Sequence, residues 1–240
     1  MKQQHLLSLV RQAVQAYDMI DDNDKIAVGI SGGKDSLILA YALGLLRKFY
    51  PKKFELIAIT VNVGFDDFNV DKVKEFMKEI DVPYHVVDTQ IYDIVFVERK
   101  EANPCSLCSK MRKAALFNYA EDMGFNKIAL GHNKDDINET LLMSLFFAGC
   151  IHTMPPVNHL DNSNVTIIRP LIYVKENDIR SYVTKNNFPV VKSPCPADGK
   201  TKREDMKNVI AELKKLNKRV PDNIFGAIER SSIEGWGIKK

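Results

Sequence analysis

The chain has 240 residues, 45% of them hydrophobic, which is enough to bury a full core in one large domain or in a domain with a small appendage. No apolar run approaches the ~20 residues of a membrane span, and residues 1–7 lack the apolar block of a signal peptide, so we expect a cytoplasmic protein. The net charge is only +3, yet residues 200–240 hold eleven Lys and Arg against six Asp and Glu. That basic end fits a polyanion such as RNA and equally fits a solvated helix face.

The first expected elements are an amphipathic helix and a strand–turn–helix unit. Apolar residues from Leu6 to Tyr17 recur with helical spacing. Residues 26–30 form an apolar run, residues 31–36 contain a glycine pair, and residues 37–49 are again amphipathic. The glycine turn therefore joins a strand to a helix.

Strands and helices alternate along the rest of the chain. The expected strands are residues 54–63, 84–87, 127–131 and 165–169, and the expected helices are residues 70–80, 106–123 and 135–147, with two more starting at Lys175 and Lys202. Residues 154–156 and 158–164 are expected to form a loop. The alternation predicts an α/β fold with a doubly wound parallel sheet, in which ligands lie beyond the carboxyl ends of the strands. Ser31, Asn62 and Gly131 would all lie there.

We expect three parts in this chain. They are an N-terminal helix in residues 1–24, the α/β domain in residues 25–192 and a basic helical appendage in residues 193–240. No internal repeat or Gly/Ser linker marks the second boundary, which is therefore a soft one.

The glycine turn is the strongest chemical signal. Two glycines let the backbone approach a ligand closely, and the start of the following helix aims N–H groups at an anion. We expect this turn to bind phosphate through the residues Ile30, Ser31, Gly32, Gly33, Asp35 and Ser36. An ordinary glycine-rich turn is the alternative. Because the pattern is not G-x-x-x-x-G-K-[ST], kinase-type transfer is not indicated.

The sequence Ser-Gly-Gly-Lys-Asp-Ser at residues 31–36 resembles the PP-loop of the ATP pyrophosphatase superfamily. The resemblance implies cleavage of ATP between the α and β phosphates and transfer of AMP to a substrate oxygen.

Four cysteines in a chain of this length do not indicate a disulfide scaffold. Cys105 and Cys108 form one Cys-x-x-Cys pair at the start of an expected helix that carries Lys110, Arg112 and Lys113, and both features favour thiolates. The pair alone leaves zinc, an iron–sulfur cluster and a redox disulfide open.

Cys195 lies between two prolines in a turn-prone segment, where a buried apolar cysteine would be unusual. With Cys105 and Cys108 it would give three thiolates, which fits a four-iron four-sulfur cluster with one open iron better than zinc or a redox disulfide. We expect Cys150 to be a small, partly buried residue outside the site.

The segment Gly131-His132-Asn133-Lys134-Asp135-Asp136 should close a strand, open a helix and face the same crevice as the glycine turn. Asp135 and Asp136 are candidates to bind magnesium or to orient a nucleophile, and we expect one of them to do so and the other to cap the helix. Arg169 follows a strand, where its guanidinium could hold phosphate oxygens; an exposed surface arginine is the alternative.

Together these segments resemble the TtcA family, the ATP-dependent tRNA 2-thiocytidine synthetases. The resemblance rests on residues 31–36, 105–112, 127–136, 154–156, 168–171, Cys195 and 209–219. It implies a Rossmann-like PP-loop fold, ATP pyrophosphate bound at residues 31–36, a four-iron four-sulfur cluster on Cys105, Cys108 and Cys195, a tRNA cytidine substrate and a homodimer. The chain lacks the terminal zinc-binding cysteines of the TtuA-type 2-thiouridine synthetases, which favours the cytidine enzymes.

Three features depart from the family pattern. Cys-Pro-Ala-Asp stands at residues 195–198 where many members have a second Cys-x-x-Cys, Gly-His-Asn replaces a common Gly-His-His, and the chain is short. These three departures bear on the identity of the substrate more than on the ATP site or the cluster site. A PP-loop sulfur transferase acting on another tRNA base or on a small molecule, and a nucleotide-binding sensor, are the rival hypotheses.

The expected reaction has two steps. The cytidine O2 attacks the α phosphate of ATP while the helix start, Lys34 and magnesium stabilise the departing pyrophosphate. Sulfide, supplied directly or through a cysteine desulfurase, then attacks the activated carbon and expels AMP. Asp136 or Arg112 would assist proton transfer.

Overall fold

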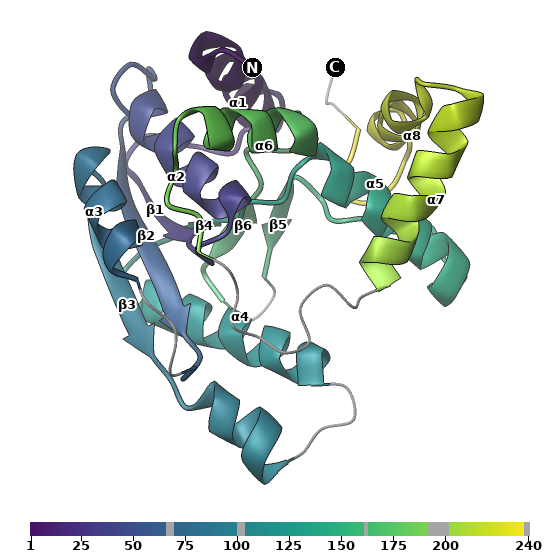
Figure 1. The fold of residues 1–240 in the computed structure, drawn as a ribbon. Coiled ribbons are helices and arrows are strands. Elements are labelled where there is room, and N and C mark those ends of the chain that lie inside the picture. The colour runs from purple at the N-terminus through teal and green to yellow at the C-terminus, as the bar shows by residue number, and fades with distance from the viewer. Residues whose placement is uncertain (66–69, 100–103, 161–162, 192–201, 238–240) are drawn as a thin grey trace.

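The computed structural model describes residues 1–65, 70–99, 104–160, 163–191 and 202–237. Within them, six strands form one sheet in the order β3-β2-β1-β4-β6-β5 (Figure 1). The strands are β1 (Asp24–Gly29), β2 (Phe54–Asn62), β3 (Tyr84–Asp88), β4 (Lys127–Ala129), β5 (Val157–His159) and β6 (Thr166–Ile168). All neighbouring pairs are parallel except β5 and β6, which are antiparallel at one edge.

Helices cover both faces of the sheet (Figure 1). α1 (Gln3–Ala16), α2 (Lys34–Leu46) and α6 (Glu176–Lys185) lie on one side, and α4 (Pro104–Asp122) lies on the other. α3 (Asp71–Glu79) packs beside β3, whereas α5 (Lys134–Met143), α7 (Lys202–Leu216) and α8 (Val220–Glu229) contact one another beyond the β5 edge. No helix in the described part of the chain is long and apolar enough to cross a membrane.

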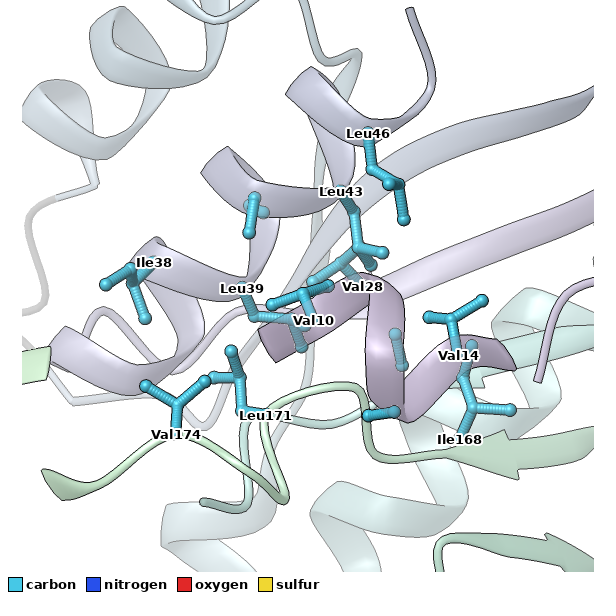
Figure 2. Packing of buried hydrophobic residues seen from close by; sticks show 14 of the residues in the cluster. Val10, Val14, Val28, Ile38, Leu39, Leu43, Leu46, Ile168, Leu171 and Val174 are labelled. Atoms are coloured by element: carbon cyan, nitrogen blue, oxygen red, sulfur yellow. The ribbon is translucent and has the colours of Figure 1, made fainter. Parts of the chain in front are cut away.

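The central strands are apolar on both faces because helices cover both faces. Ile26 and Val28 of β1 belong to the core cluster on the side of α1 and α2, whereas Ala27 between them belongs to the cluster on the side of α4. Figure 2 shows Val10 of α1 and Leu39 of α2 packed close to Val28. Burial of each such Val or Leu side chain contributes about 1.5–3 kcal/mol, so this layer fixes where β1 ends and α2 begins.

Both ends of the chain contribute to the same core. Leu6 of α1, Phe225 and Ile228 of α8, and Trp236 all belong to the cluster that contains Val28. Lys134 of α5 bonds to Asp222 at 2.9 Å and lies over the Phe225 ring, which fastens α8 to the sheet domain. The division at residues 24 and 192 stays a prediction.

The structure confirms the α/β class and the expected order of its main elements and corrects four details. Residues 157–159 form the antiparallel edge strand β5, where we expected loop from residue 158. The helix expected at 135–147 is α5 followed by a π-helical segment at Ser144–Ala148. Two elements were not expected, the π-helical segment Asp93–Glu98 and helix α8.

Candidate active site

The glycine turn lies between β1 and α2, at the carboxyl end of the sheet, as the sequence predicts. Gly32 has φ +80, a conformation that favours glycine, and Gly33 is the N-cap of α2. The Ser36 hydroxyl donates to the Gly33 carbonyl at 2.9 Å and accepts from the Ser31 N–H at 3.2 Å. The turn is thus held by its own hydroxyl groups, while the helix start keeps backbone N–H groups for a ligand.

A second turn packs directly against the first. A Cβ added to Gly131 would lie 3.0 Å from the carbonyl carbon and oxygen of Asp35 and 3.1 Å from the Ser36 nitrogen. Position 131, between β4 and α5, is therefore a glycine, because the backbone of the phosphate-binding turn occupies the space that a side chain would need.

The two turns border a cavity of about 540 Å³ beyond the strand ends. Its lining includes nine of the residues singled out in the sequence: Ile30, Ser31, Asp35, Ser36, Arg112, Gly131, His132, Asp136 and Arg169. The remaining lining residues were not singled out as site residues: Gly29, Ile59, Val61, Ser109, Lys113, Leu116, Leu130 and Met154. From the sequence, Lys113 is indicated only as a charge near the cysteines, and most of the others are apolar residues whose pattern indicates core.

The N-cap residue of α5 is Asn133 rather than Asp135 or Asp136. Its side-chain Oδ1 accepts from the N–H groups of Asp135 and Asp136 at 2.9 and 3.3 Å, and Asp136 Oδ2 accepts in return from the Asn133 N–H at 2.9 Å. Asp135 does not line the cavity, and its Oδ2 accepts from the Glu176 N–H at 2.7 Å. The N-cap residue itself is therefore Asn133 and not an aspartate, while Asp136 completes the capping box and is also the aspartate that lines the cavity.

Asp136 is half-buried and Glu139, one turn further along α5, is buried. Arg203 of α7 donates through Nη1 to Asp136 Oδ1 at 3.1 Å, and its Nε lies 3.7 Å from Glu139 Oε2. Burial raises the pKa of Asp136, while the Asn133 N–H and Arg203 oppose that rise. Burial, with the Asp136 charge added, raises the pKa of Glu139 to about 8.

The cavity lining also includes the cations Arg112, Lys113 and Arg169. Arg169 is buried, with 4% exposed, and its Nη1 donates to the Pro155 carbonyl. Within the described structure its Nε has no hydrogen-bond partner, and burial lowers its pKa to about 10, so the guanidinium stays charged. This excludes the alternative of an exposed surface arginine.

His132 stands beside these cations. Burial, followed by the charges of Arg169, Arg203 and Lys113, lowers the pKa of His132 to about 3. Its ring is therefore neutral at physiological pH. Burial also lowers the pKa of Lys113, and the Arg169 charge adds to this effect.

Lys34 does not line the cavity, and its ammonium group takes part in a charge network. Its Nζ lies 2.8 Å from Asp35 Oδ2 and 2.9 Å from Glu176 Oε1. Burial lowers the pKa of Lys34, but Asp35 and Glu176 outweigh burial and leave that pKa above its usual value. Lys207 of α7 approaches the second Glu176 oxygen at 3.5 Å.

Cys105 and Cys108 lie in the first turn of α4, one exposed and one half-buried. Ser109, Arg112 and Lys113 on the same helix line the cavity, so the cysteine pair stands at the end of one cavity wall. The third expected ligand, Cys195, lies outside the described residues. Among the residues that are described, no three His, Cys, Asp or Glu side chains cluster as a metal site. Cys150 is exposed, which corrects the expectation that it is partly buried.

Three other expected residues, Asn62, Gly32 and Gly33, are near the site without lining it. Asn62 ends β2, where its side chain donates to Asp88 and accepts from the Gly64 N–H. Gly32 and Gly33 shape the turn rather than the cavity wall. Glu139, Glu176 and Arg203 were missed, because a charged residue in a helical pattern normally indicates a solvated face.

The arrangement suits chemistry on a phosphoanhydride. The start of α2 and the cations Arg169 and Lys113 provide positive potential for phosphate oxygens, and Asp136 provides a carboxylate within the same cavity. The thiol pair lies at one end of the wall that carries Arg112.

Comparisons with known proteins place this site in context. The family model for the PP-loop domain matches residues 3–213. The tRNA-cytidine(32) 2-sulfurtransferase of Geobacter sulfurreducens is 39% identical over 222 residues, which cover 91% of this chain and 86% of that protein.

Solved structures show the same fold. The U34-tRNA thiolase NcsA from Methanococcus maripaludis, solved with its [4Fe-4S] cluster, aligns with a TM-score of 0.76 and 27% identity over 93% of this chain and 77% of that one. The NH3-dependent NAD synthetase of Campylobacter jejuni aligns with a TM-score of 0.53 and 14% identity, covering 94% and 91% of the two chains, which shows a shared fold alone.

Proposed function

Because the chain belongs to the PP-loop family, and within it to the tRNA-cytidine(32) 2-sulfurtransferases, we propose that it replaces the C2 oxygen of a tRNA cytidine with sulfur at the expense of ATP. One observation carries this proposal: the phosphate-binding turn and the helix with the Cys-x-x-Cys pair border the same cavity. A nucleotide-binding site and a sulfur-handling site thereby share one reaction space.

ATP binds with its pyrophosphate at the start of α2. The backbone N–H groups after Gly33 and the positive end of the helix hold the departing phosphates. Lys34 adds a charge beside them once phosphate competes with Asp35 and Glu176 for its ammonium group. Arg169, whose Nε has no hydrogen-bond partner among the described residues, would hold the α phosphate.

Magnesium fits the same turn. Asp35 lines the cavity at the phosphate-binding turn, and one or two carboxylates together with phosphate oxygens are the usual ligands of this ion. Asp35 would hold the ion, whose charge offsets that of the phosphate oxygens.

The side chains Asp136 and Arg112 act on the substrate base. The cytidine O2 attacks the α phosphorus and the bond to the pyrophosphate oxygen breaks, which leaves C2 bonded to an AMP leaving group. A sulfur nucleophile then adds to C2 and AMP departs. Asp136 accepts the proton that the sulfur nucleophile loses, and the Arg112 guanidinium stabilises negative charge as AMP leaves.

The cysteines fit an iron–sulfur cluster. Cys105 and Cys108 are three residues apart in one helical turn, so both thiols lie on the same helix face and at its positive end. Cys105, Cys108 and Cys195 would hold a four-iron four-sulfur cluster, which supplies a place to bind the sulfur that enters the base. The same cluster type is named for the structurally similar thiolase NcsA.

The partners follow from the reaction. Besides tRNA, the protein needs a sulfur donor, either free sulfide or a cysteine desulfurase. The family resemblance, and not the reaction, is the reason for proposing a homodimer, and a tRNA substrate fits a place in the cytoplasm.

The nucleosides of bulk tRNA test this function. A strain without this gene should lack 2-thiocytidine by mass spectrometry, and the wild-type gene should restore it. Cys195→Ala should not restore it, whereas the matched control Cys150→Ala should, because Cys150 is exposed and lines no part of the cavity. Loss of 2-thiouridine would move the reaction to a uridine, and an unchanged profile would favour a small-molecule substrate.

A further inference from the structure

Both oxygens of the Asp136 carboxylate are held, and they are held by different parts of the chain. Oδ2 accepts from the Asn133 N–H at 2.9 Å within the helix cap of α5. Oδ1 accepts from Arg203 Nη1 at 3.1 Å, across 67 residues of sequence. The first contact comes with the helix start, whereas the second exists only when α7 lies against α5.

We infer that Arg203 is a positioning residue for Asp136: from outside the cavity it fixes the orientation of this carboxylate toward the base. The inference rests on the proposed function, since it assigns Asp136 a role in base thiolation. Arg203 itself is not among the residues that line the cavity.

The burial of the three side chains supports this assignment. The exposed fractions are 19% for Asp136, 2% for Glu139 and 37% for Arg203, so the two carboxylates are enclosed and the cation reaches them from the surface. Without Arg203, both acids would face each other along one face of α5, and nothing among the described contacts would keep Oδ1 of Asp136 in place.

Residues other than Arg203 hold α7 against α5. Met206 and Ile210 of α7 pack with Leu142 in a separate buried cluster, and Lys207 reaches Glu176 at 3.5 Å. The helix therefore keeps its place when Arg203 is replaced, and the expected loss concerns the orientation of one carboxylate.

Steady-state kinetics of the full-length holoenzyme test the inference. We would compare Arg203→Gln, Arg203→Lys and a control, Lys215→Gln. The control removes a cation of α7 that, among the described residues, pairs with the exposed Glu212 at 2.6 Å. Arg203→Gln should lower kcat for tRNA thiolation about 10- to 100-fold and leave KM for ATP and tRNA within about threefold. Arg203→Lys should recover part of kcat, and the control should match the parent.

Two kinetic results would overturn the inference. One is an Arg203→Gln enzyme with the parental kcat. The other is a loss that falls on KM for tRNA, because Arg203 would then be an RNA contact. In an Asp136→Asn background, Arg203→Gln should cause little further loss of kcat, since its effect runs through Asp136.

The same pair of variants separates this inference from the proposed function. If the parent thiolates no tRNA, the proposed function is wrong, and thermal unfolding of the parent, both single variants and the double variant then decides the positioning claim. If Arg203 and Asp136 are coupled, Arg203→Gln lowers the free energy of unfolding more in the parent than in the Asp136→Asn protein. Additive effects on stability would mean that Arg203 does not hold Asp136.

Discussion

Replacing Gly131 with alanine should damage the phosphate-binding turn without touching any residue of that turn. The new Cβ would lie 3.0 Å from the Asp35 carbonyl and 3.1 Å from the Ser36 nitrogen. Both neighbours are backbone atoms in the first turn of α2, so neither can rotate away as a flexible side chain would. One of the two turns must shift by a few tenths of an ångström.

The size of the effect follows from that geometry. Overpacking of a well-packed site costs about 1–3 kcal/mol, which lowers the melting temperature of a chain of this length by about 2–12 °C. The Ser36 N–H is among the donors that the helix start offers to phosphate. Loss of one hydrogen bond to a charged group weakens ATP binding by about 10- to 150-fold.

Calorimetric titration with ATP and a thermal melt measure the two effects, with Gly124→Ala as the matched control. Gly124 has φ +75 and nothing within 4 Å of an added Cβ, so its replacement strains the backbone by about 1–2 kcal/mol but reaches no other turn. Both variants should lose stability, and only Gly131→Ala should lose ATP affinity. Parental ATP affinity in Gly131→Ala would refute the contact between the two turns as the reason for the glycine.

Three further changes test neighbouring parts of the site. Asn133→Asp keeps the acceptor of the helix cap but replaces the amide that donates to Asp35 with a second carboxylate. The free energy of unfolding in urea should fall by about 1–3 kcal/mol, and by more at low salt. Stability equal to that of the parent would contradict the contact between Asn133 and Asp35. The pKa of His132 is about 3 in the folded protein against 6.5 in the unfolded chain, so the free energy of unfolding should fall as the pH drops from 6.5 toward 3. His132→Gln should flatten this part of the plot of stability against pH. Parallel plots for the parent and the variant would exclude His132 as the cause. Asp35→Ala should abolish pyrophosphate release yet keep the parental iron content per chain, and full ATP-dependent activity would remove Asp35 from the reaction.

The parts of the site that depend on local sequence were predictable. The turn at residues 31–36 combines glycines, a strand before it and a helix after it, and all three signals are local. Gly131 and Arg169 follow the same logic, because each comes within two residues of the end of a parallel strand, and Asp136 lies in the first turn of the helix that follows β4. The TtcA resemblance added the ligand classes, which spacing alone left open.

The charge network was not predictable from local pattern. Within the expected helices, nothing in the local pattern distinguishes Glu139, Glu176 or Arg203 from solvated charges. Each has an ion-pair partner far along the chain, Lys34 for Glu176 and Arg203 for Glu139. The short edge strand β5 was missed for a related reason, since its three residues are strand only through pairing with β6. Long-range pairing, rather than propensity, decides both cases.

The helix cap of α5 shows why the choice among three polar residues needed the folded structure. An aspartate would cap the helix as well as an asparagine, judged by its acceptor alone. The cap must also meet the phosphate-binding turn, where Asn133 Nδ2 donates to Asp35 Oδ1 at 3.1 Å. Of Asn133, Asp135 and Asp136, only the asparagine side chain can both accept from its own helix and donate to the carboxylate of the adjacent turn. Asn133 therefore takes the cap, and Asp136 is left to line the cavity with its two oxygens held by the cap and by Arg203.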